Sequence, residues 1–235
     1  MYMYPIKNTV PQPSKHIWHT TLLLTIIAGF CDTVTFVAAD ALFSAHVTGN
    51  FIVFAYQIVR GSDIMAWVKL LTFPIFIIAV MAGGRIGSTS VNRYRLLFWE
   101  GILLTTGGLI LLLINHTYTH SSWIIYPVAM VVVFAMGLQN AFGKLYAKET
   151  YGSTTMMTGN VTQAALDLGN LFKTRFKDAE ISLNFKNQLV TLSGFLAGCC
   201  LGAVTGNFFG LSIIVVPGIA LLLCYFNNRD TTSTQ

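Results

Sequence analysis

The side chains best suited to binding chemistry lie in two short stretches that the chain repeats. Residues 46–50 (HVTGN) and 156–160 (MMTGN) share the tripeptide Thr-Gly-Asn, 110 residues apart. Threonine and asparagine side chains can cap a helix or bind a solute, and glycine permits the positive φ of a tight turn. Each copy is therefore a candidate helix start and a candidate binding segment.

Similar residues around both copies indicate an internal duplication. Residues 29–32 (GFCD) precede the first copy and residues 137–140 (GLQN) precede the second, each at the end of an apolar run. Residues 82–87 (AGGRIG) and 197–202 (AGCCLG) follow them with the same A-G-x-x-x-G spacing. Three matches in the same order are typical of a repeat; the alternative is chance similarity among small residues. The A-G-x-x-x-G segments favour close helix packing, either between the repeats or in a homodimer.

Asp32 is the first candidate for a proton- or cation-binding group. It lies deep in the first apolar run, where an ionisable side chain indicates a functional site that faces a cavity. Alternatively, the helix begins late and Asp32 reaches the outer interface. Its counterpart in the second half is Asn140, which cannot titrate, so a carried proton would belong to the first half. His46 could relay that proton, or be an interfacial histidine with a local partner.

Two more acids interrupt other apolar segments. Asp167 could line a vestibule, but the neighbouring charges favour pairing with Lys173 or Lys144. Glu100 lies close to the cytoplasmic start of a predicted helix, which favours an interface residue. Together with the repeated stretches, the candidate solute- or ion-binding residues are Asp32, His46, Thr48, Gly49, Asn50, Gln139, Asn140, Thr158, Gly159, Asn160 and Asp167.

The composition excludes an ordinary soluble domain. Hydrophobic residues make up 54% of the 235 residues and charged residues 10%, whereas soluble domains carry about 25% charged residues. Mean hydropathy is +0.64, and several apolar runs approach the ~20 residues that a membrane-spanning helix requires. These values predict an all-α polytopic membrane protein. In such a protein the net charge of +5 reflects the lysines and arginines that collect in cytoplasmic loops, and it does not indicate a nucleic-acid partner.

Apolar segments predict six transmembrane helices and two half-length helices. At 1.5 Å per residue, the ten residues of the first half-length helix reach about 15 Å, half of a ~30 Å hydrocarbon core. The predicted spans are residues 17–39, 64–84, 96–114, 123–142, 188–208 and 211–226, and the half-length helices are residues 50–59 and 160–172. The predicted organisation is an N-terminal tail (1–16), a first membrane repeat (17–114), an external connector (115–122), a second membrane repeat (123–226) and a C-terminal tail (227–235).

The distribution of lysine and arginine indicates that both half-length helices are re-entrant. If both crossed the membrane, nine of these residues would face the cytoplasm and five the outside; if both are re-entrant, the split is twelve to two. Cytoplasmic loops carry the excess, so six spans with both termini in the cytoplasm are favoured. Because three spans per repeat is an odd number, the two repeats insert in opposite orientations, as the inverted repeats of many secondary transporters do.

Re-entrant backbone is tolerated at membrane depth only where it is buried in protein or lines a wet cavity. The two Thr-Gly-Asn stretches are therefore expected to meet at one internal site, with Gly49 and Gly159 at the turns and Asn50 and Asn160 as N-caps. Two helix N-termini at such a site would favour an anion. Alternatively, each cap satisfies its own helix and no ligand binds.

Signatures of the common enzyme classes are absent from the sequence. Residues 137–144 (GLQNAFGK) look like a phosphate-binding loop, but the glycine spacing is too long and Leu145 stands where Ser or Thr is required. Neither H-E-x-x-H nor G-x-S-x-G occurs. The four cysteines lie in apolar runs without metal-ligand spacing. We therefore expect no catalytic residue, no cofactor and no metal site.

Four segments resemble the YoaK-like family, a group of bacterial multi-pass inner-membrane proteins described as a domain of unknown function. They are residues 29–32 (GFCD), 43–50 (FSAHVTGN), 137–140 (GLQN) and 154–160 (TTMMTGN), and the similarity covers nearly the whole chain. Cys31 departs from the small or aliphatic residue that is common in the family. The resemblance implies a bacterial cytoplasmic membrane location and about six spans, and it brings no substrate or mechanism with it.

Together these features predict a secondary transporter or exporter of a small polar or anionic solute, in which Asp32 couples transport to protons. The alternatives are a membrane scaffold or partner-binding subunit without transport, and a passive channel built on the same repeats.

Overall fold

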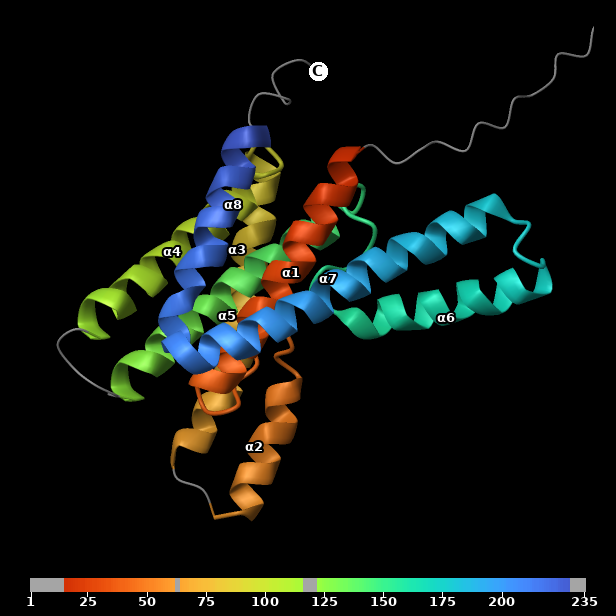
Figure 1. The fold of residues 1–235 in the computed structure, drawn as a ribbon. Coiled ribbons are helices and arrows are strands. Elements are labelled where there is room, and N and C mark those ends of the chain that lie inside the picture. Colours follow the sequence, from red (N-terminus) through yellow and green to blue (C-terminus); the bar gives the residue numbers. More distant parts are fainter. Residues whose placement is uncertain (1–14, 62–63, 116–121, 229–235) are drawn as a thin grey trace, which may run out of the picture.

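The computed structural model describes residues 15–61, 64–115 and 122–228, and the regular structure in these ranges is entirely helical (Figure 1). Each of the predicted helices has a counterpart, so the all-α prediction is confirmed. The elements are α1 (Lys15–Ala38), α2 (Gly49–Val59), the 3₁₀ turn η1 (Ile64–Trp67), α3 (Val68–Thr89), α4 (Arg95–Asn115), α5 (Ser122–Leu145), α6 (Met157–Lys173), α7 (Ala179–Phe209), the 3₁₀ turn η2 (Gly210–Ile214) and α8 (Val215–Asn228).

Five described segments are long and apolar enough to cross a membrane, as in a polytopic membrane protein. Four are single helices, and the fifth, Ala179–Asn228, contains α7, η2 and α8. Gly210 divides this last segment, because its φ of 62° lies in the left-handed region that glycine adopts without strain. α2 has only 11 residues, about 16 Å of helix, which is too short to cross a ~30 Å core.

Helices from the two halves of the chain pack against each other. α1 lies along α7, α3 lies along α5, and α4 contacts both α8 and α5. Glycines permit the closest approaches: a Cβ at Gly198 on α7 would lie 2.1 Å from the carbonyl oxygen of Ile26 on α1. A Cβ at Gly83 on α3 would lie 2.6 Å from the Cβ of Ala141 on α5. The A-G-x-x-x-G segments therefore pack between the halves, one of the two predicted arrangements.

We expect Gly198→Ala to lower the free energy of unfolding by about 1–3 kcal/mol, because the added methyl group overlaps the backbone of α1 and the two helices must separate to admit it. Gly84→Ala is the matched control. It lies in the other A-G-x-x-x-G segment, and no described neighbour comes within 4 Å of its added Cβ. Thermal unfolding in detergent compares the two variants, and equal melting temperatures would contradict the close packing of α7 on α1.

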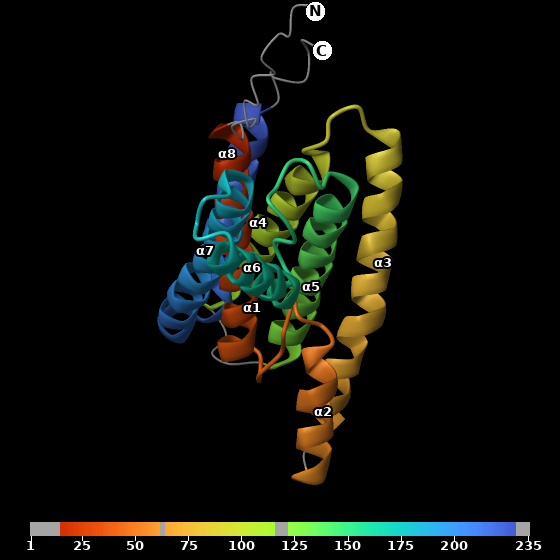
Figure 2. The ribbon, with the colours of Figure 1, turned by 90° about the vertical axis from the view of Figure 1, so that its right-hand side faces the viewer.

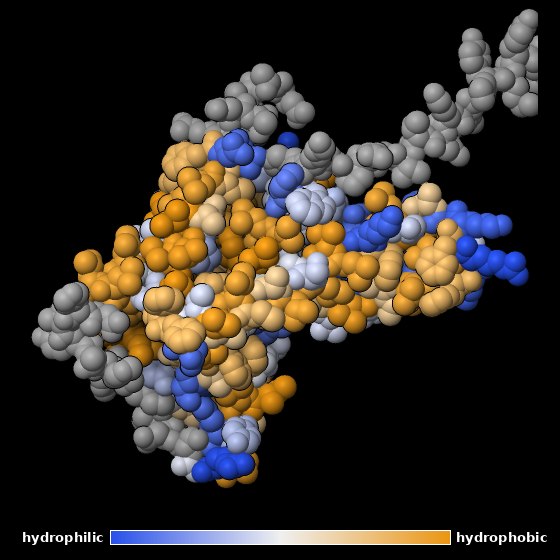
Figure 3. Space-filling view, in the orientation of Figure 1, coloured by the Kyte–Doolittle hydropathy of each residue, from blue (hydrophilic) through white to orange (hydrophobic). Residues whose placement is uncertain are grey.

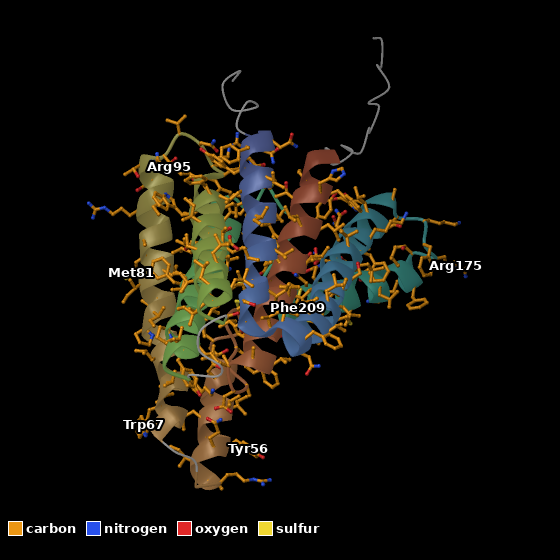
Figure 4. All side chains as sticks on the ribbon, turned by 60° about the vertical axis from the view of Figure 1, so that its left-hand side comes forward. Tyr56, Trp67, Met81, Arg95, Arg175 and Phe209 are labelled. Carbon is orange, nitrogen blue, oxygen red and sulfur yellow. The ribbon has the colours of Figure 1, made fainter. Side chains whose placement is uncertain are left out.

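Two helical hairpins extend from the bundle. α2 with the start of α3 extends beyond one end, and α6 with the first half of α7 extends to the side (Figures 1 and 2). Both α2 and α6 begin near the middle of the molecule and run outward from it. The face shown in Figure 3 is mainly apolar, with hydrophilic residues at the hairpin tips and at the upper end of the bundle. Exposed apolar side chains on α3, such as Phe73, Ile77 and Met81, are suited to lipid contact. Met81 is labelled in Figure 4.

The observed helices differ from the predicted ones mainly at their starts. α6 begins at Met157, three residues before its predicted start, and α7 begins at Ala179, nine residues before. Asp178 caps α7 by accepting hydrogen bonds from the N–H groups of Glu180 and Ile181 at 3.0 and 3.1 Å. The additional turns of α7 are polar, so a hydropathy pattern does not reveal them.

Candidate functional site

The carboxylate of Asp32 joins α1 to the connector that leads to α2. Asp32 is 4% exposed and lies inside the first candidate span, so its carboxylate is enclosed by protein. Its Oδ2 lies 2.6 Å from Nδ1 of His46, and its Oδ1 accepts a hydrogen bond from the N–H of Ala45 at 2.7 Å. The connector can fold back onto Asp32 because Asp40 and Ala41 take positive φ values of 53° and 56°.

Asp32 and His46 form an ion pair when the imidazole is protonated. The hydrogen bond to Asp32 raises the pKa of His46 above its ordinary value, partial burial offsets some of this rise, and the carboxylate charge adds to it. The pair therefore combines a buried carboxylate with an imidazole that can take up and release a proton.

A cavity of about 320 Å³ lies beside this pair, between α1, the connector and α7. Aromatic rings follow one another along it. Ring centroids are 4.9 Å apart for Phe36 and Phe43, 6.4 Å for Phe43 and His46, and 5.6 Å for His46 and Phe195. The residues that line the cavity are Asp32, Thr33, Phe36, Phe43, His46, Phe195 and Cys199.

Asn50 and Asn160 make the same contact in the two halves. Asn50 Nδ2 donates to the carbonyl oxygen of Phe43, and Asn160 Nδ2 donates to that of Ser153, each at 2.7 Å and seven residues back. The prediction that both are N-caps is wrong, because each lies inside the first turn of its helix and holds the preceding connector instead. Asn50 also donates to Thr72 Oγ1 at 3.0 Å, which ties the connector to α3.

Both Thr-Gly pairs lie at helix starts, and the predicted glycine turns are wrong. Gly49 and Gly159 are helical, and neither has a positive φ. A Cβ added at Gly49 would lie 3.0 Å from the ring of Phe43. Thr48 and Thr158 are exposed. Among the residues that the structure describes, neither tripeptide lines the cavity and no hydrogen bond joins one tripeptide to the other.

Gln139 and Asn140 fasten the second connector to the bundle. Gln139 Nε2 donates to the carbonyl oxygen of Leu24 at 2.9 Å and to Thr154 Oγ1 at 3.0 Å. Asn140 Nδ2 donates to Thr155 Oγ1 at 2.9 Å. These amides therefore contact α1 and the connector before α6, away from the residues of the cavity.

Asp167 lies on α6, apart from the cavity. It is buried, and its Oδ1 accepts a hydrogen bond from Gln163 Nε2 at 2.8 Å. The predicted pairing with Lys173 or Lys144 is wrong, because the salt bridges in the described part of the chain involve neither lysine. Oδ2 of Asp167 has no hydrogen-bond partner among the described residues.

Two ionisable groups that the sequence did not place in the core are fully buried, each 0% exposed. Lys69 Nζ donates to Asp40 Oδ2 at 3.1 Å and to the carbonyl oxygens of Asp40 and Ala39. Glu100, which was expected at the membrane interface, is completely enclosed by neighbouring side chains. A helical wheel could have revealed it, because the buried Leu97 is one turn away on the same face.

We expect Glu100 to carry a proton at neutral pH. Neither of its carboxylate oxygens has a hydrogen-bond partner in the described part of the chain, and an unpartnered buried charge is strongly disfavoured. None of the salt bridges in the described part of the chain involves Glu100. Infrared difference spectra of wild type and Glu100→Gln should contain the C=O band of a protonated carboxyl. Carboxylate bands in its place would show that the group is ionised.

Taken together, the helices and the site define a helical membrane protein in which a buried carboxylate and imidazole border a cavity. The chain matches a family model described as a protein of unknown function (DUF1275) over residues 20–226, and it belongs to that family. The match runs from α1 to α8, and the resemblance to YoaK-like proteins is consistent with it. A search of curated proteins and a search of solved structures found no match.

Proposed function

We propose that this protein is a proton-coupled secondary transporter of a small polar solute in a bacterial cytoplasmic membrane. The observation that carries the proposal is the contact of Asp32, which is buried inside an apolar span, with His46 of the following connector, beside a cavity that both residues line. Ionisable groups inside spanning segments are costly and mark solute paths and proton relays. A scaffold would not require a titratable pair beside a cavity.

Equivalent contacts in the two halves support an inverted repeat. Asp32 contacts Ala45 as Asn140 contacts Thr155, so corresponding side chains fasten both connectors. The two asparagine contacts to the carbonyl seven residues back correspond in the same way. In such a repeat α1 corresponds to α5 and α3 corresponds to α7. A twofold relation then requires that α1 packs on α7 and that α5 packs on α3, and both contacts are present.

The proposed topology has six spans, with α2 and α6 re-entrant and both termini cytoplasmic. Arg95 lies at one end of the bundle and Trp67 at the other (Figure 4). We therefore expect a cysteine at Arg60, at the end of α2, to react with a membrane-impermeant thiol reagent added outside. Cysteines at Arg93 and Lys173 should react only from the cytoplasmic side. Labelling of Arg93→Cys from outside, with Arg60→Cys protected, is the pattern of eight spans and would overturn this topology.

Flux through the purified protein in proteoliposomes tests the transporter. A panel of small amines, amino acids and carboxylates, offered across an imposed pH gradient, should include a solute whose uptake saturates and stops when a protonophore removes the gradient. Conduction that does not saturate would indicate the passive channel. A folded protein with no flux across the panel would indicate the scaffold. Either of these results overturns the proposal.

A further inference from the structure

We propose that the transported solute is an organic cation, an ammonium group on a small apolar body, which binds beside Asp32 in exchange for the proton of His46. This inference rests on the proposed function and narrows the solute class at the same site. It replaces the anion expected from two helix N-termini, because the cavity lies against a carboxylate and its lining includes neither Thr-Gly-Asn segment.

The charges around the cavity favour a positive ligand. α1 contributes Asp32, the connector contributes His46, and α7 contributes Phe195 and Cys199. The described lining contains no lysine or arginine, so a negative ligand beside Asp32 would find only the imidazolium that Asp32 already engages. A cation instead takes over the role of that imidazolium as the partner of the carboxylate.

The phenyl rings favour an organic cation over a metal ion. Ring faces carry negative charge density and attract cations, and the rings also accommodate an alkyl or aryl body. Phe36, Phe43 and Phe195 contribute such rings to the lining beside Asp32. A metal ion would need several oxygen or nitrogen ligands, and the described residues contain no group of three or more His, Cys, Asp or Glu that could hold one.

The exchange conserves charge in the cavity. The exchange starts from the ion pair of Asp32 with the imidazolium form of His46. When the ammonium group binds beside Asp32, the imidazolium gives one proton to water and remains as a neutral ring, with Nδ1 still facing Asp32 Oδ2. One positive charge enters as another leaves, so a proton gradient across the membrane can drive the cation in the opposite direction.

Cys199 can report occupancy, because its thiol lines the cavity whereas that of the adjacent Cys200 does not. The full chain would keep one of these two cysteines, with the other three cysteines replaced by alanine, and would be labelled by a water-soluble thiol reagent. Benzyltrimethylammonium, benzyl alcohol and benzoate are matched probes that share a ring and differ in charge. We expect benzyltrimethylammonium alone to slow labelling of Cys199, and none of the three to slow labelling of Cys200.

Proton release tests the exchange. At a pH at which His46 is protonated, binding of benzyltrimethylammonium in weak buffer should release about one proton per cation. His46→Gln keeps the carboxylate and should bind the cation without releasing a proton, whereas Asp32→Asn should lose both effects. If Asp32→Asn does not fold, the comparison of wild type with His46→Gln still tests the exchange, because only wild type should release a proton.

The outcomes separate this inference from the proposed function. Protection of Cys199 by benzoate, or equal protection by benzyl alcohol, overturns the cation assignment. Gradient-driven flux of a carboxylate without binding of benzyltrimethylammonium overturns it as well and leaves the transporter in place. Cation binding with proton release, in a protein that shows no gradient-driven flux of any amine, supports the cation site and overturns the transporter.

Discussion

Asp32→Asn is expected to reduce proton-coupled flux to the level of empty liposomes, with the fold retained. Asparagine still offers Oδ1 to the N–H of Ala45, but it carries no charge to hold the proton of His46. The pKa of His46 should therefore fall toward its ordinary value of about 6.5. Flux in proteoliposomes and an NMR titration of the histidine ring measure the two effects in the same preparation.

The direction of the His46 shift determines how the pair depends on pH. Because the folded-state pKa is raised, the attraction between Asp32 and His46 is complete below the ordinary histidine pKa of about 6.5 and is lost as the pH rises through the raised value. Wild-type stability should decline through that window, and the decline should disappear in Asp32→Asn.

Controls distinguish the loss of coupling from a general loss of the fold. Glu180→Gln neutralises an exposed acid at the start of α7, outside the cavity, and should keep wild-type flux. Asp32→Asn itself should cost about 1–3 kcal/mol of stability, because one hydrogen bond to a charged group is weakened. Wild-type flux with an unchanged pH profile in Asp32→Asn would show that the carboxylate does not couple transport.

The two halves place different chemistry at corresponding positions. Asp32 in the first half and Asn140 in the second both fasten a connector, yet only Asp32 can be ionised. The position of His46 is occupied in the second half by Met156, which is exposed. If both connectors had only to be held in place, two amides would suffice. The acid and the imidazole in one half therefore indicate a function that the other half does not share.

Hydropathy predicted the helices of this chain well, because the length of an apolar run follows from the thickness of a bilayer. α1 was expected at residues 17–39 and is Lys15–Ala38. The N-caps Asn50 and Asn160 were predicted wrongly, because capping rules assume a bond within the first turn. Asn50 instead reaches the carbonyl of Phe43, a partner that exists only once the connector has folded back.

The contacts that form the site could not be predicted from the spacing of residues in the sequence. The sequence indicated Asp32 as an interior acid, but the approach of His46 requires the chain to reverse at Asp40 and Ala41, two non-glycine residues with positive φ. The burial of Lys69 and Glu100 was missed because a single charge is averaged out in an apolar window. Whether such a charge meets water, lipid or a partner is decided by neighbouring helices.

Asp40→Asn is expected to lower the free energy of unfolding by about 3 kcal/mol. Lys69 is fully buried at the start of α3, and Asp40 supplies the carboxylate at 3.1 Å. Removing one partner of a buried ion pair costs about 3–5 kcal/mol, because the remaining charge is uncompensated. The lower end applies here, since the side chain of Asp40 is 53% exposed and water screens part of the interaction. Asparagine tolerates the φ of 53° at this position as aspartate does.

Lys69→Met separates the effect of the uncompensated lysine charge from any effect of Asp40→Asn on the turn at residue 40. A methionine of similar length fills the buried site without a charge, and such replacements are often neutral or stabilising. In the Asp40→Asn background it should restore most of the lost stability, and the double-mutant cycle from denaturant unfolding should give a coupling energy of about 2 kcal/mol. If Lys69→Met restores nothing, the carboxylate stabilises the protein through another contact. The hydrogen bond from Gln57 Nε2 at 2.9 Å is the alternative, and Gln57→Ala would then reproduce the whole loss.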